Sequence, residues 1–166
     1  MTEKELAQRL SAVRLVILDV DGVLTDGKVL VGDQGAETLR FDIQDGYGIV
    51  LAMREGLLFA IISGREAGAV DARARQLGIE IVHQGQRDKR RAFQDVLRET
   101  AVELEHIAYI GDDLNDLPIM AQVGVVCAVA NARPEVKEAA DVVTSARGGD
   151  GAVREFLDLI MAAREG

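Results

Sequence analysis

The sequence predicts an α/β fold: a single Rossmann-like parallel sheet with helices on both faces and a small β-hairpin that projects from it. Three observations support this prediction. Short apolar runs alternate with amphipathic stretches, several of the runs are almost continuously apolar, and glycines end most of the amphipathic stretches. Continuous apolar runs are typical of strands covered on both faces, and glycine is common just beyond a helix. Strands that alternate with helices favour a parallel sheet with right-handed crossovers.

The elements follow this alternation in order. The predicted strands are the apolar runs at residues 15–18, 58–62, 79–82, 107–110 and 123–129. The predicted helices are the amphipathic stretches at residues 47–54, 66–77, 88–100, 115–122 and 151–163. Residues 27–41 depart from the alternation, because two short apolar segments flank a Gly32-Asp33 turn there, which predicts the hairpin. We expect residues 1–166 to form one domain, as the chain length allows.

The composition is that of a globular protein with an acidic surface. Of the 166 residues, 48% are hydrophobic and 28% are charged, and 28 acidic against 19 basic side chains give a net charge of −9. This charge repels nucleic acid and anionic membranes, so we expect neither as a partner. The charged segment around Glu3 and Glu5 has no signal-peptide core, and no run approaches the ~20 apolar residues of a membrane span. We therefore expect a cytoplasmic protein.

Polar side chains follow the predicted strands at the point where each strand ends. They come from four separate strands: Asp19 and Asp21 after the first, Ser63 and Arg65 after the second, Lys89 at the start of the helix after the third, and Asp112 and Asp113 after the fourth. The carboxyl ends of parallel strands meet at one edge, where α/β sheets bind their ligands. We therefore expect these groups to lie close together.

The chemistry of these groups predicts phosphoryl transfer. Asp19 can attack phosphorus to give an aspartyl-phosphate, and Asp21 faces the same side if the strand continues. Asp21 is then placed to protonate the leaving oxygen and later to deprotonate the attacking water. Mg²⁺ prefers a few carboxylates plus water, and we expect Asp19, Asp112 and the backbone carbonyl of Asp21 to bind it. Ser63 and Lys89 are expected to bind the phosphoryl oxygens.

Other interpretations of the same residues fit less well. A calcium-binding loop would start at Asp19, but its twelfth position is Leu30 rather than glutamate. A phospho-receiver signalling domain would have paired acids after the first strand and a lone aspartate near the third, whereas here an Asp-Asp pair follows the fourth strand. A catalytically inactive binding protein would have lost at least one member of the set that is complete here, namely Asp19, Asp21, Lys89 and Asp112.

The ordered segments resemble the four motifs of the haloacid dehalogenase superfamily. The matching segments are residues 19–25 (DVDGVLT), 62–64 (ISG), Lys89 and 111–116 (GDDLND). Within the superfamily, residues 18–27, 41–48 (FDIQDGYG), 83–85 and 148–155 (GGDGAVRE) look like the subfamily of phosphatases that act on 3-deoxy-D-manno-octulosonate 8-phosphate in lipopolysaccharide synthesis. Only 25 residues separate Ser63 from Lys89. That spacing leaves no room for the cap domain that many members carry, so we expect none.

The resemblance implies a sugar-acid pocket beside the phosphate site. Its expected residues are Phe41, Asp42, Ile43, Gln44 and Asp45, with the cations of Arg65 and Arg73 near the substrate's carboxylate or phosphate. It also implies that Asp113 and Asp116 support the magnesium ligands without binding the ion themselves. The family often has arginine at the positions of Gln44 and Val50. A nonulosonate 9-phosphate or another small sugar phosphate therefore stays open as the substrate.

The resemblance and the hairpin together predict a homotetramer whose active sites are completed by neighbouring subunits. A site without a cap is open to water, so its cover must come from elsewhere. The hairpin is too apolar for an isolated two-stranded ribbon, which is only marginally stable in water; its apolar residues are Val29, Leu30, Val31 and Leu39. We expect copies of it to pack around a closed ring, and the turn at residues 148–151 to reach a neighbour. The alternative is a hairpin folded back on its own domain.

Overall fold

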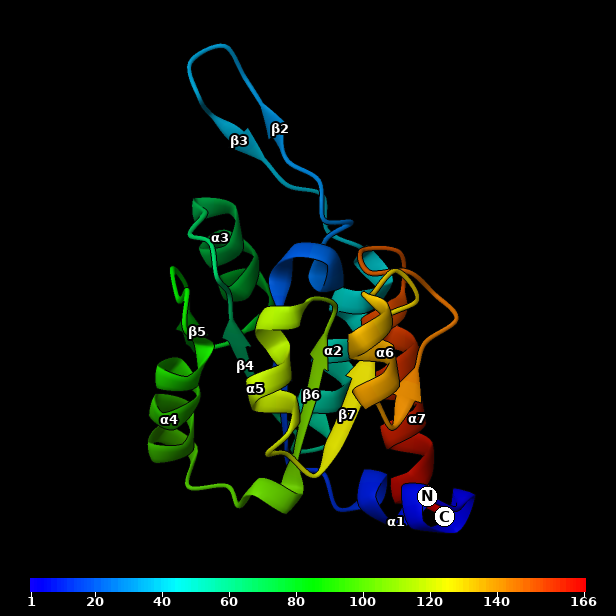
Figure 1. The fold of residues 1–166 in the computed structure, drawn as a ribbon. Helices are drawn as coiled ribbons and strands as arrows, with labels where there is room; N and C mark the ends of the chain where they lie inside the picture. The colour runs from blue at the N-terminus through cyan, green and yellow to red at the C-terminus, as the bar shows by residue number, and fades with distance from the viewer.

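The computed structural model describes residues 1–166 and confirms the predicted fold class (Figure 1). Six strands form one sheet in the order β5-β4-β1-β6-β7-β8, and every neighbouring pair is parallel. The strands are β1 (Leu15–Leu18), β4 (Leu58–Ile62), β5 (Ile81–His83), β6 (Ile107–Gly111), β7 (Val125–Ala128) and β8 (Val142–Val143). The central strand β1 is fully buried between β4 and β6, as its unbroken apolar run predicts.

Helices cover both faces of the sheet. They are α1 (Glu3–Ser11), α2 (Ile43–Arg54), α3 (Gly68–Leu77), α4 (Lys89–Thr100), α5 (Leu117–Met120), α6 (Pro134–Ala139) and α7 (Ala152–Glu165). On one face α7 packs against α2 and α1, and on the other α5 lies between α4 and α6 (Figure 1). None of these helices combines the length and apolar character needed to cross a membrane.

Several element boundaries differ from the predicted ones. Helix α2 begins four residues earlier than expected, because the carboxylate of Asp42 accepts a hydrogen bond from the N–H of Asp45 and caps it. The helix predicted at residues 115–122 is instead a 3₁₀ turn, Leu114–Asp116, followed by the short α5. Helices α1 and α6 and the two-residue strand β8 were not predicted at all.

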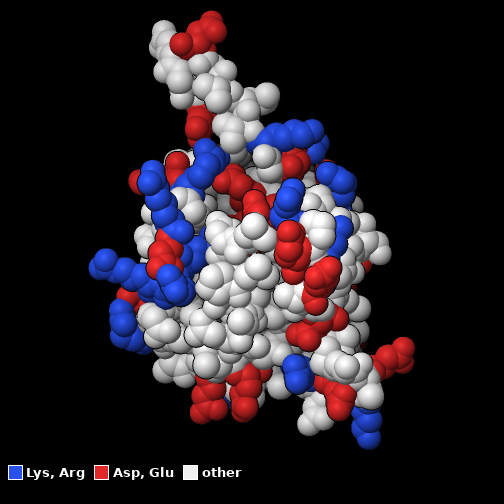
Figure 2. Space-filling model, in the orientation of Figure 1, with Lys and Arg blue, Asp and Glu red and all other residues white.

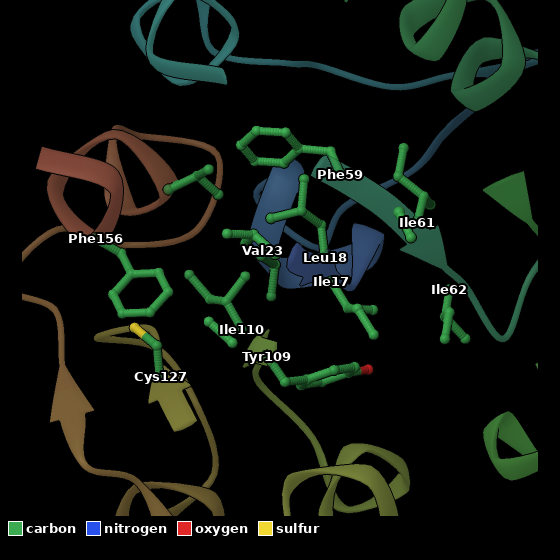
Figure 3. Packing of buried hydrophobic residues seen from close by; sticks show 14 of the residues in the cluster. Ile17, Leu18, Val23, Phe59, Ile61, Ile62, Tyr109, Ile110, Cys127 and Phe156 are labelled. Atoms are coloured by element: carbon green, nitrogen blue, oxygen red, sulfur yellow. The ribbon is translucent and has the colours of Figure 1, made fainter. Parts of the chain in front are cut away.

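The core lies between the sheet and its two helical layers. Forty buried hydrophobic residues form one continuous cluster. Figure 3 shows how β1, β4 and β6 supply its centre through Ile17, Ile61 and Ile110, with Phe156 of α7 closing one side. A close-packed core of this extent holds the strand ends in fixed positions, which a precise active site requires.

The predicted hairpin is present and projects away from the sheet (Figure 1). It consists of the antiparallel strands β2 (Leu30–Val31) and β3 (Glu37–Thr38). Leu30 and Val31 are 72% and 66% exposed, so the hairpin does not fold back on its own domain. At its base, Phe41 pairs with Thr25 in an isolated antiparallel bridge, which fixes the hairpin to the segment that follows β1.

The glycine-rich turn before α7 is fixed against the segment that follows β1. The N–H of Gly149 donates to the carbonyl of Val23 at 2.9 Å, and the N–H of Gly148 donates to Oδ1 of Asn131 at 2.7 Å. A side chain at Gly148 would collide with the carbonyl group of Gly22. The glycines of this turn therefore allow a close contact within the chain. The expectation that the turn also reaches a neighbouring subunit stays a prediction.

Candidate active site

The segment that leaves β1 turns instead of continuing as a strand. Asp19 follows β1 directly, and residues Val20–Leu24 form a tight helical turn with Gly22 at φ 87°. A side chain at Gly22 would also collide with the carboxylate of Asp112, so glycine lets this turn approach the end of β6. The assumption that a continuing strand aligns Asp19 with Asp21 is therefore wrong, although both residues remain at the predicted edge.

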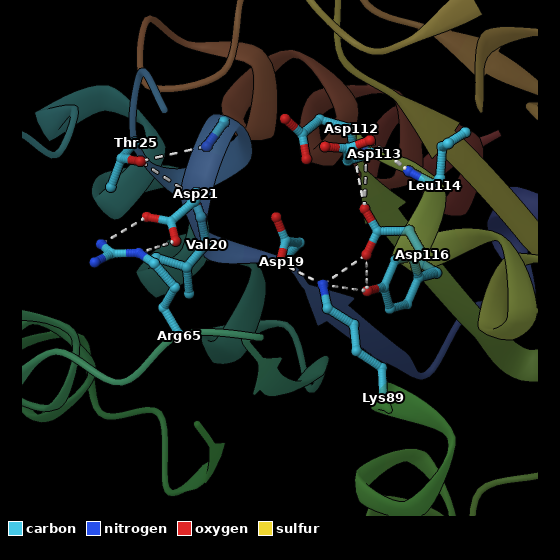
Figure 4. Close-up of polar contacts among 12 residues, drawn as sticks. Asp19, Val20, Asp21, Thr25, Arg65, Lys89, Asp112, Asp113, Leu114 and Asp116 are labelled. Atoms are coloured by element: carbon cyan, nitrogen blue, oxygen red, sulfur yellow. Dashed lines mark hydrogen bonds and ion pairs between the residues drawn. The ribbon is translucent and has the colours of Figure 1, made fainter. Parts of the chain in front are cut away.

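Lys89 joins two carboxylates at the centre of this edge (Figure 4). Its side chain is fully buried, and its Nζ lies 2.5 Å from Oδ1 of Asp19 and 2.6 Å from Oδ1 of Asp116. Burial alone would lower the pKa of Lys89, but the two carboxylates outweigh it and raise that pKa. The side chain is thus a buried ammonium held beside the candidate nucleophile.

Asp116 is saturated with hydrogen-bond donors. Its Oδ1 accepts from Lys89 and, at 2.6 Å, from the hydroxyl of Tyr109. Its Oδ2 accepts from the N–H groups of Asp112 and Asp113 at 2.9 and 3.2 Å. A carboxylate offers about four lone-pair sites, so Asp116 has none left for a metal ion. Its role as a support for the metal ligands stays a prediction.

The carboxylates at this edge fit a hard divalent cation. Carboxylate oxygens of Asp19, Asp112 and Asp116 all lie within 4.8 Å of one another, although those of Asp116 are occupied by hydrogen bonds. Burial and the nearby carboxylates of Asp116 and Asp113 raise the pKa of Asp112 to about 7. Lys89 contacts only one oxygen of Asp19, which leaves the other oxygen and the Asp112 carboxylate as ligands. The donor set therefore suits Mg²⁺, and binding of the ion by Asp19, Asp112 and the backbone carbonyl of Asp21 stays a prediction.

Asp21 faces Arg65 rather than Lys89 (Figure 4). The Nε and Nη2 atoms of Arg65 donate to the two carboxylate oxygens of Asp21 at 2.7 and 3.2 Å. The Nη1 atom of Arg65 donates to Glu37 of the hairpin strand β3 at 3.0 Å. All three side chains are between 31% and 39% exposed. The proposed proton-transfer residue is therefore connected to the hairpin through one arginine.

Two further predicted residues lie at the same edge but outside the cluster around Lys89. Ser63 is buried at the end of β4, where its N–H donates to the carbonyl of His83 and its own carbonyl accepts from Gln86. Asp113 is exposed, and its carboxylate caps the 3₁₀ turn by accepting from the N–H of Leu114. Neither side chain forms a direct hydrogen bond with Asp19 or Lys89.

The predicted sugar-acid pocket is only partly assembled as expected. The guanidinium of Arg73 lies 5.8 Å from the ring centre of Phe41, and its Nη2 donates to the carbonyl of Asp42 at 3.0 Å. Ile43 and Gln44 are exposed on the first turn of α2. Ile43 and Gln44 can therefore be reached from solvent, whereas Phe41 and Asp42 are half-buried and in contact with Arg73.

Asp45 does not line this surface, contrary to the prediction. It is 1% exposed, and its Oδ1 accepts a hydrogen bond from the N–H of Arg154 at 2.8 Å, which caps α7. Its Oδ2 has no hydrogen-bond partner. Burial raises the pKa of Asp45 to about 6, although backbone N–H groups of α7 oppose this effect. Asp45 therefore joins α2 to α7.

Two residues of the site were missed in the sequence. The hydroxyl of Tyr109 donates to Asp116. The sequence feature that could have indicated this role is a tyrosine in an otherwise aliphatic strand, shortly before the Gly-Asp-Asp segment. Asn131 donates to the carbonyl of Gly22 at 3.1 Å and accepts from Gly148, so it joins three loops. Nothing in the local sequence around Asn131 marks it, because its partners are distant along the chain.

Comparisons with known proteins agree with this geometry. A family model described as haloacid dehalogenase-like hydrolase matches residues 72–157. The 3-deoxy-D-manno-octulosonate 8-phosphate phosphatase of Yersinia pestis is 46% identical over 161 residues, which cover 97% of this chain and 86% of that protein. The protein of the same name from Escherichia coli (strain K12) is 48% identical over 152 residues, which cover 92% of this chain and 81% of that protein.

A solved structure extends this similarity to the fold. The 3-deoxy-D-manno-octulosonate 8-phosphate phosphatase from Moraxella catarrhalis was solved in complex with magnesium ion, phosphate ion and KDO molecule. It aligns with a TM-score of 0.95 at 39% identity and covers 99% of this chain and 94% of that chain. The family model spans half of the chain, and the relatives span nearly all of it, including the edge that carries Asp19 and Lys89. On this evidence the chain belongs to the haloacid dehalogenase-like hydrolase family.

Proposed function

We propose that this chain is a Mg²⁺-dependent phosphatase that hydrolyses 3-deoxy-D-manno-octulosonate 8-phosphate to the free sugar acid and phosphate, in lipopolysaccharide precursor synthesis. The observation that carries the proposal is the buried ammonium of Lys89, held 2.5 Å from Asp19 with Asp112 alongside. This arrangement belongs to a chain 39% identical to a relative that was solved with magnesium, phosphate and the sugar acid. The substrate is assigned by that similarity, and the reaction type by the site.

The proposed reaction proceeds in two steps. In the first, a carboxylate oxygen of Asp19 attacks phosphorus, the bond from phosphorus to the sugar oxygen breaks, and Asp21 gives that oxygen a proton. In the second, Asp21 takes a proton from water as the water oxygen attacks the aspartyl-phosphate, which releases phosphate and restores Asp19. Lys89 and Ser63 bind phosphoryl oxygens in both steps. A bound Mg²⁺ supplies neutralisation of the negative charges that meet at phosphorus.

Arg65 must change partners during this cycle. Its guanidinium is shared between Asp21 and Glu37, and an incoming anionic substrate competes with both carboxylates for it. A substrate that draws Arg65 toward its own carboxylate or phosphate leaves Asp21 free to take up a proton and transfer it. Substrate binding then also frees Asp21 from Arg65. While no substrate is bound, the carboxylate of Asp21 stays paired with Arg65.

The surface charge supports an anionic substrate despite the net charge of −9. Figure 2 shows Lys and Arg side chains near the base of the hairpin and along the flank that carries α3 and α4. Acidic side chains lie between them at the edge of the sheet. Local cations of this kind raise the concentration of an anion near the site even when the distant field repels it.

The assembly and location follow from the same proposal. A hairpin with Leu30 and Val31 mostly exposed suits packing between copies, so the working unit is a homotetramer in which neighbouring hairpins cover the open sites. We also propose a cytoplasmic location, because the proposed substrate is an intermediate of lipopolysaccharide synthesis.

A phosphate-release assay on a panel of esters tests the substrate. Wild-type protein with Mg²⁺ is given 3-deoxy-D-manno-octulosonate 8-phosphate, a nonulosonate 9-phosphate and hexose phosphates. We expect kcat/KM for the octulosonate to exceed that for hexose phosphates by at least about tenfold, or ~1.4 kcal/mol of discrimination. Equal or better rates with the nonulosonate would assign the chain to that related group instead.

A further inference from the structure

Tyr109 is the one tyrosine of the core, and its hydroxyl lies inside the cluster around Lys89. The ring is completely buried in β6 among aliphatic neighbours, while the hydroxyl is directed away from the apolar cluster (Figure 3). The hydroxyl oxygen lies 2.6 Å from Oδ1 of Asp116 and 3.4 Å from Nζ of Lys89. Phenylalanine would fill the same apolar space without a polar atom to satisfy.

The hydroxyl and the ammonium share a single acceptor. Oδ1 of Asp116 receives both Tyr109 and Lys89, while its Oδ2 receives two backbone N–H groups. The ammonium of Lys89 is in turn divided between Asp116 and Asp19, at 2.6 and 2.5 Å. Any change in how strongly Asp116 attracts Lys89 must therefore change how closely Lys89 holds Asp19.

We infer that Tyr109 is a positioning residue that keeps the Lys89 ammonium between Asp116 and Asp19, where phosphoryl transfer needs it. The inference rests on the proposed phosphatase function. By donating to Oδ1, the tyrosine satisfies part of the Asp116 charge and weakens its pull on Lys89. Without that donor, Lys89 is the only partner of Oδ1 and moves toward Asp116, into the space of the missing oxygen and away from Asp19.

The competing account is purely structural. In that account the hydroxyl only satisfies a buried carboxylate, and its loss costs folding stability but leaves the position of Lys89 unchanged. The two accounts differ in the turnover number, because a displaced ammonium stabilises the phosphoryl charge less in the transition state. They agree on stability, so a melting temperature alone does not separate them.

The first test compares Tyr109→Phe with Tyr47→Phe. The chain has two tyrosines, and Tyr47 is 56% exposed on α2, which makes it a matched control for loss of one hydroxyl. Hydrolysis of p-nitrophenyl phosphate with Mg²⁺ is measured, because this ester needs no sugar contacts. We expect Tyr109→Phe to lower kcat by about tenfold or more with KM within about threefold, and Tyr47→Phe to change neither by more than about twofold.

A kcat for Tyr109→Phe within about twofold of wild type, with a lowered melting temperature, would overturn the inference and leave the phosphatase function intact. Failure of the wild-type protein to hydrolyse any ester would instead overturn the proposed function and, with it, this inference. The two failures are thus distinguishable in one experiment.

A second measurement decides the case if Tyr109→Phe does not fold. The chain has no tryptophan, so Tyr47→Phe leaves Tyr109 as the only tyrosine and the dominant near-ultraviolet chromophore. Inorganic phosphate is titrated into this variant with Mg²⁺ present, and the tyrosine absorption and fluorescence are followed. We expect a saturable change as Lys89 turns toward the phosphate oxygens and the hydrogen bonding of Tyr109 adjusts. An unchanged tyrosine signal at phosphate concentrations that inhibit hydrolysis would overturn the inference.

Discussion

Arg65 holds the carboxylate of Asp21 with two nitrogen atoms, at 2.7 and 3.2 Å, while its third reaches Glu37 in the projecting hairpin. The hairpin is thereby joined to the residue proposed to transfer protons. In contrast, the side chain of Lys89, which contacts Asp19 and Asp116, is fully buried. The site thus has one ionic contact that is partly exposed to water and one that is buried, and the two should differ in their contribution to stability.

Stability measurements on two variants test this contrast. Glu37→Gln should cost less than ~1 kcal/mol of unfolding free energy, because exposed ion pairs contribute little. Lys89→Met should cost roughly 3 kcal/mol or more, because it leaves two buried carboxylates without a counterion. Urea unfolding of both variants without Mg²⁺ measures the difference. Equal losses would show that the Lys89 contacts are not the buried ion pairs described here.

The roles of Asp21 and Asp112 separate in metal binding. Asp21→Asn keeps the backbone carbonyl and should therefore keep Mg²⁺, yet lose proton transfer, which is typically worth ~10²–10⁴-fold in rate. Asp112→Ala should weaken Mg²⁺ binding directly, because it removes a carboxylate ligand. Titration calorimetry with MgCl₂ on both variants reports the affinities. Loss of the metal in Asp21→Asn with retention in Asp112→Ala would reverse the assignment.

The gathering of the site residues at one edge of the sheet could be predicted from the sequence, because it depends on one geometric rule. Parallel strands bring the positions just beyond their carboxyl ends together, whatever the details of the loops. Such positions are held by Asp19, Lys89 and Asp112. The orientation of Asp21 could not be predicted, because the turn at Gly22 depends on how closely Asp112 approaches it. Side-chain direction here is a consequence of contact between two loops.

Contacts between distant segments explain the other differences. Asp45 caps α7 across 109 positions of sequence, and its neighbours in the chain give no sign of this partner. The sequence indicates Tyr109 only as part of an apolar strand, because the role of its hydroxyl depends on the hydrogen bond to Asp116. Short elements such as α6 and β8 were missed because they contain too few residues for a periodic pattern.

The buried carboxyl of Asp45 predicts a pH-dependent stability. Its pKa is about 6 in the folded chain, above its ordinary value, so the folded state holds the proton more tightly than the unfolded state. The contribution of Asp45 to stability is therefore full below about pH 4 and is lost as pH rises to about 6, by roughly 2–3 kcal/mol.

Asp45→Asn removes this titration and keeps the oxygen that caps α7. Unfolding free energies of wild type and variant, measured between pH 4 and 7, should show the wild type losing stability relative to the variant as pH rises. Parallel pH curves for the two proteins would contradict the assigned burial of this carboxyl group.

The hairpin predicts the state of assembly. The double variant Leu30→Asp, Val31→Asp places charges on the exposed apolar strand and should convert the proposed homotetramer to smaller species, because like charges would meet between hairpins. Leu104→Asp, at another exposed apolar position far along the chain, is the control and should leave assembly unchanged. Light scattering gives the mass directly. A wild-type monomer of 17.9 kDa with full activity would refute the shared-site assembly.

The most direct test of the central claim is the rate of phosphate release by Asp19→Asn. The amide is close in size to the carboxylate but cannot form the aspartyl-phosphate, so we expect the fold to remain, by circular dichroism, and kcat to fall by several orders of magnitude. Retention of more than about a tenth of the wild-type rate, a barrier change below ~1.4 kcal/mol, would contradict the assignment of Asp19 as the nucleophile.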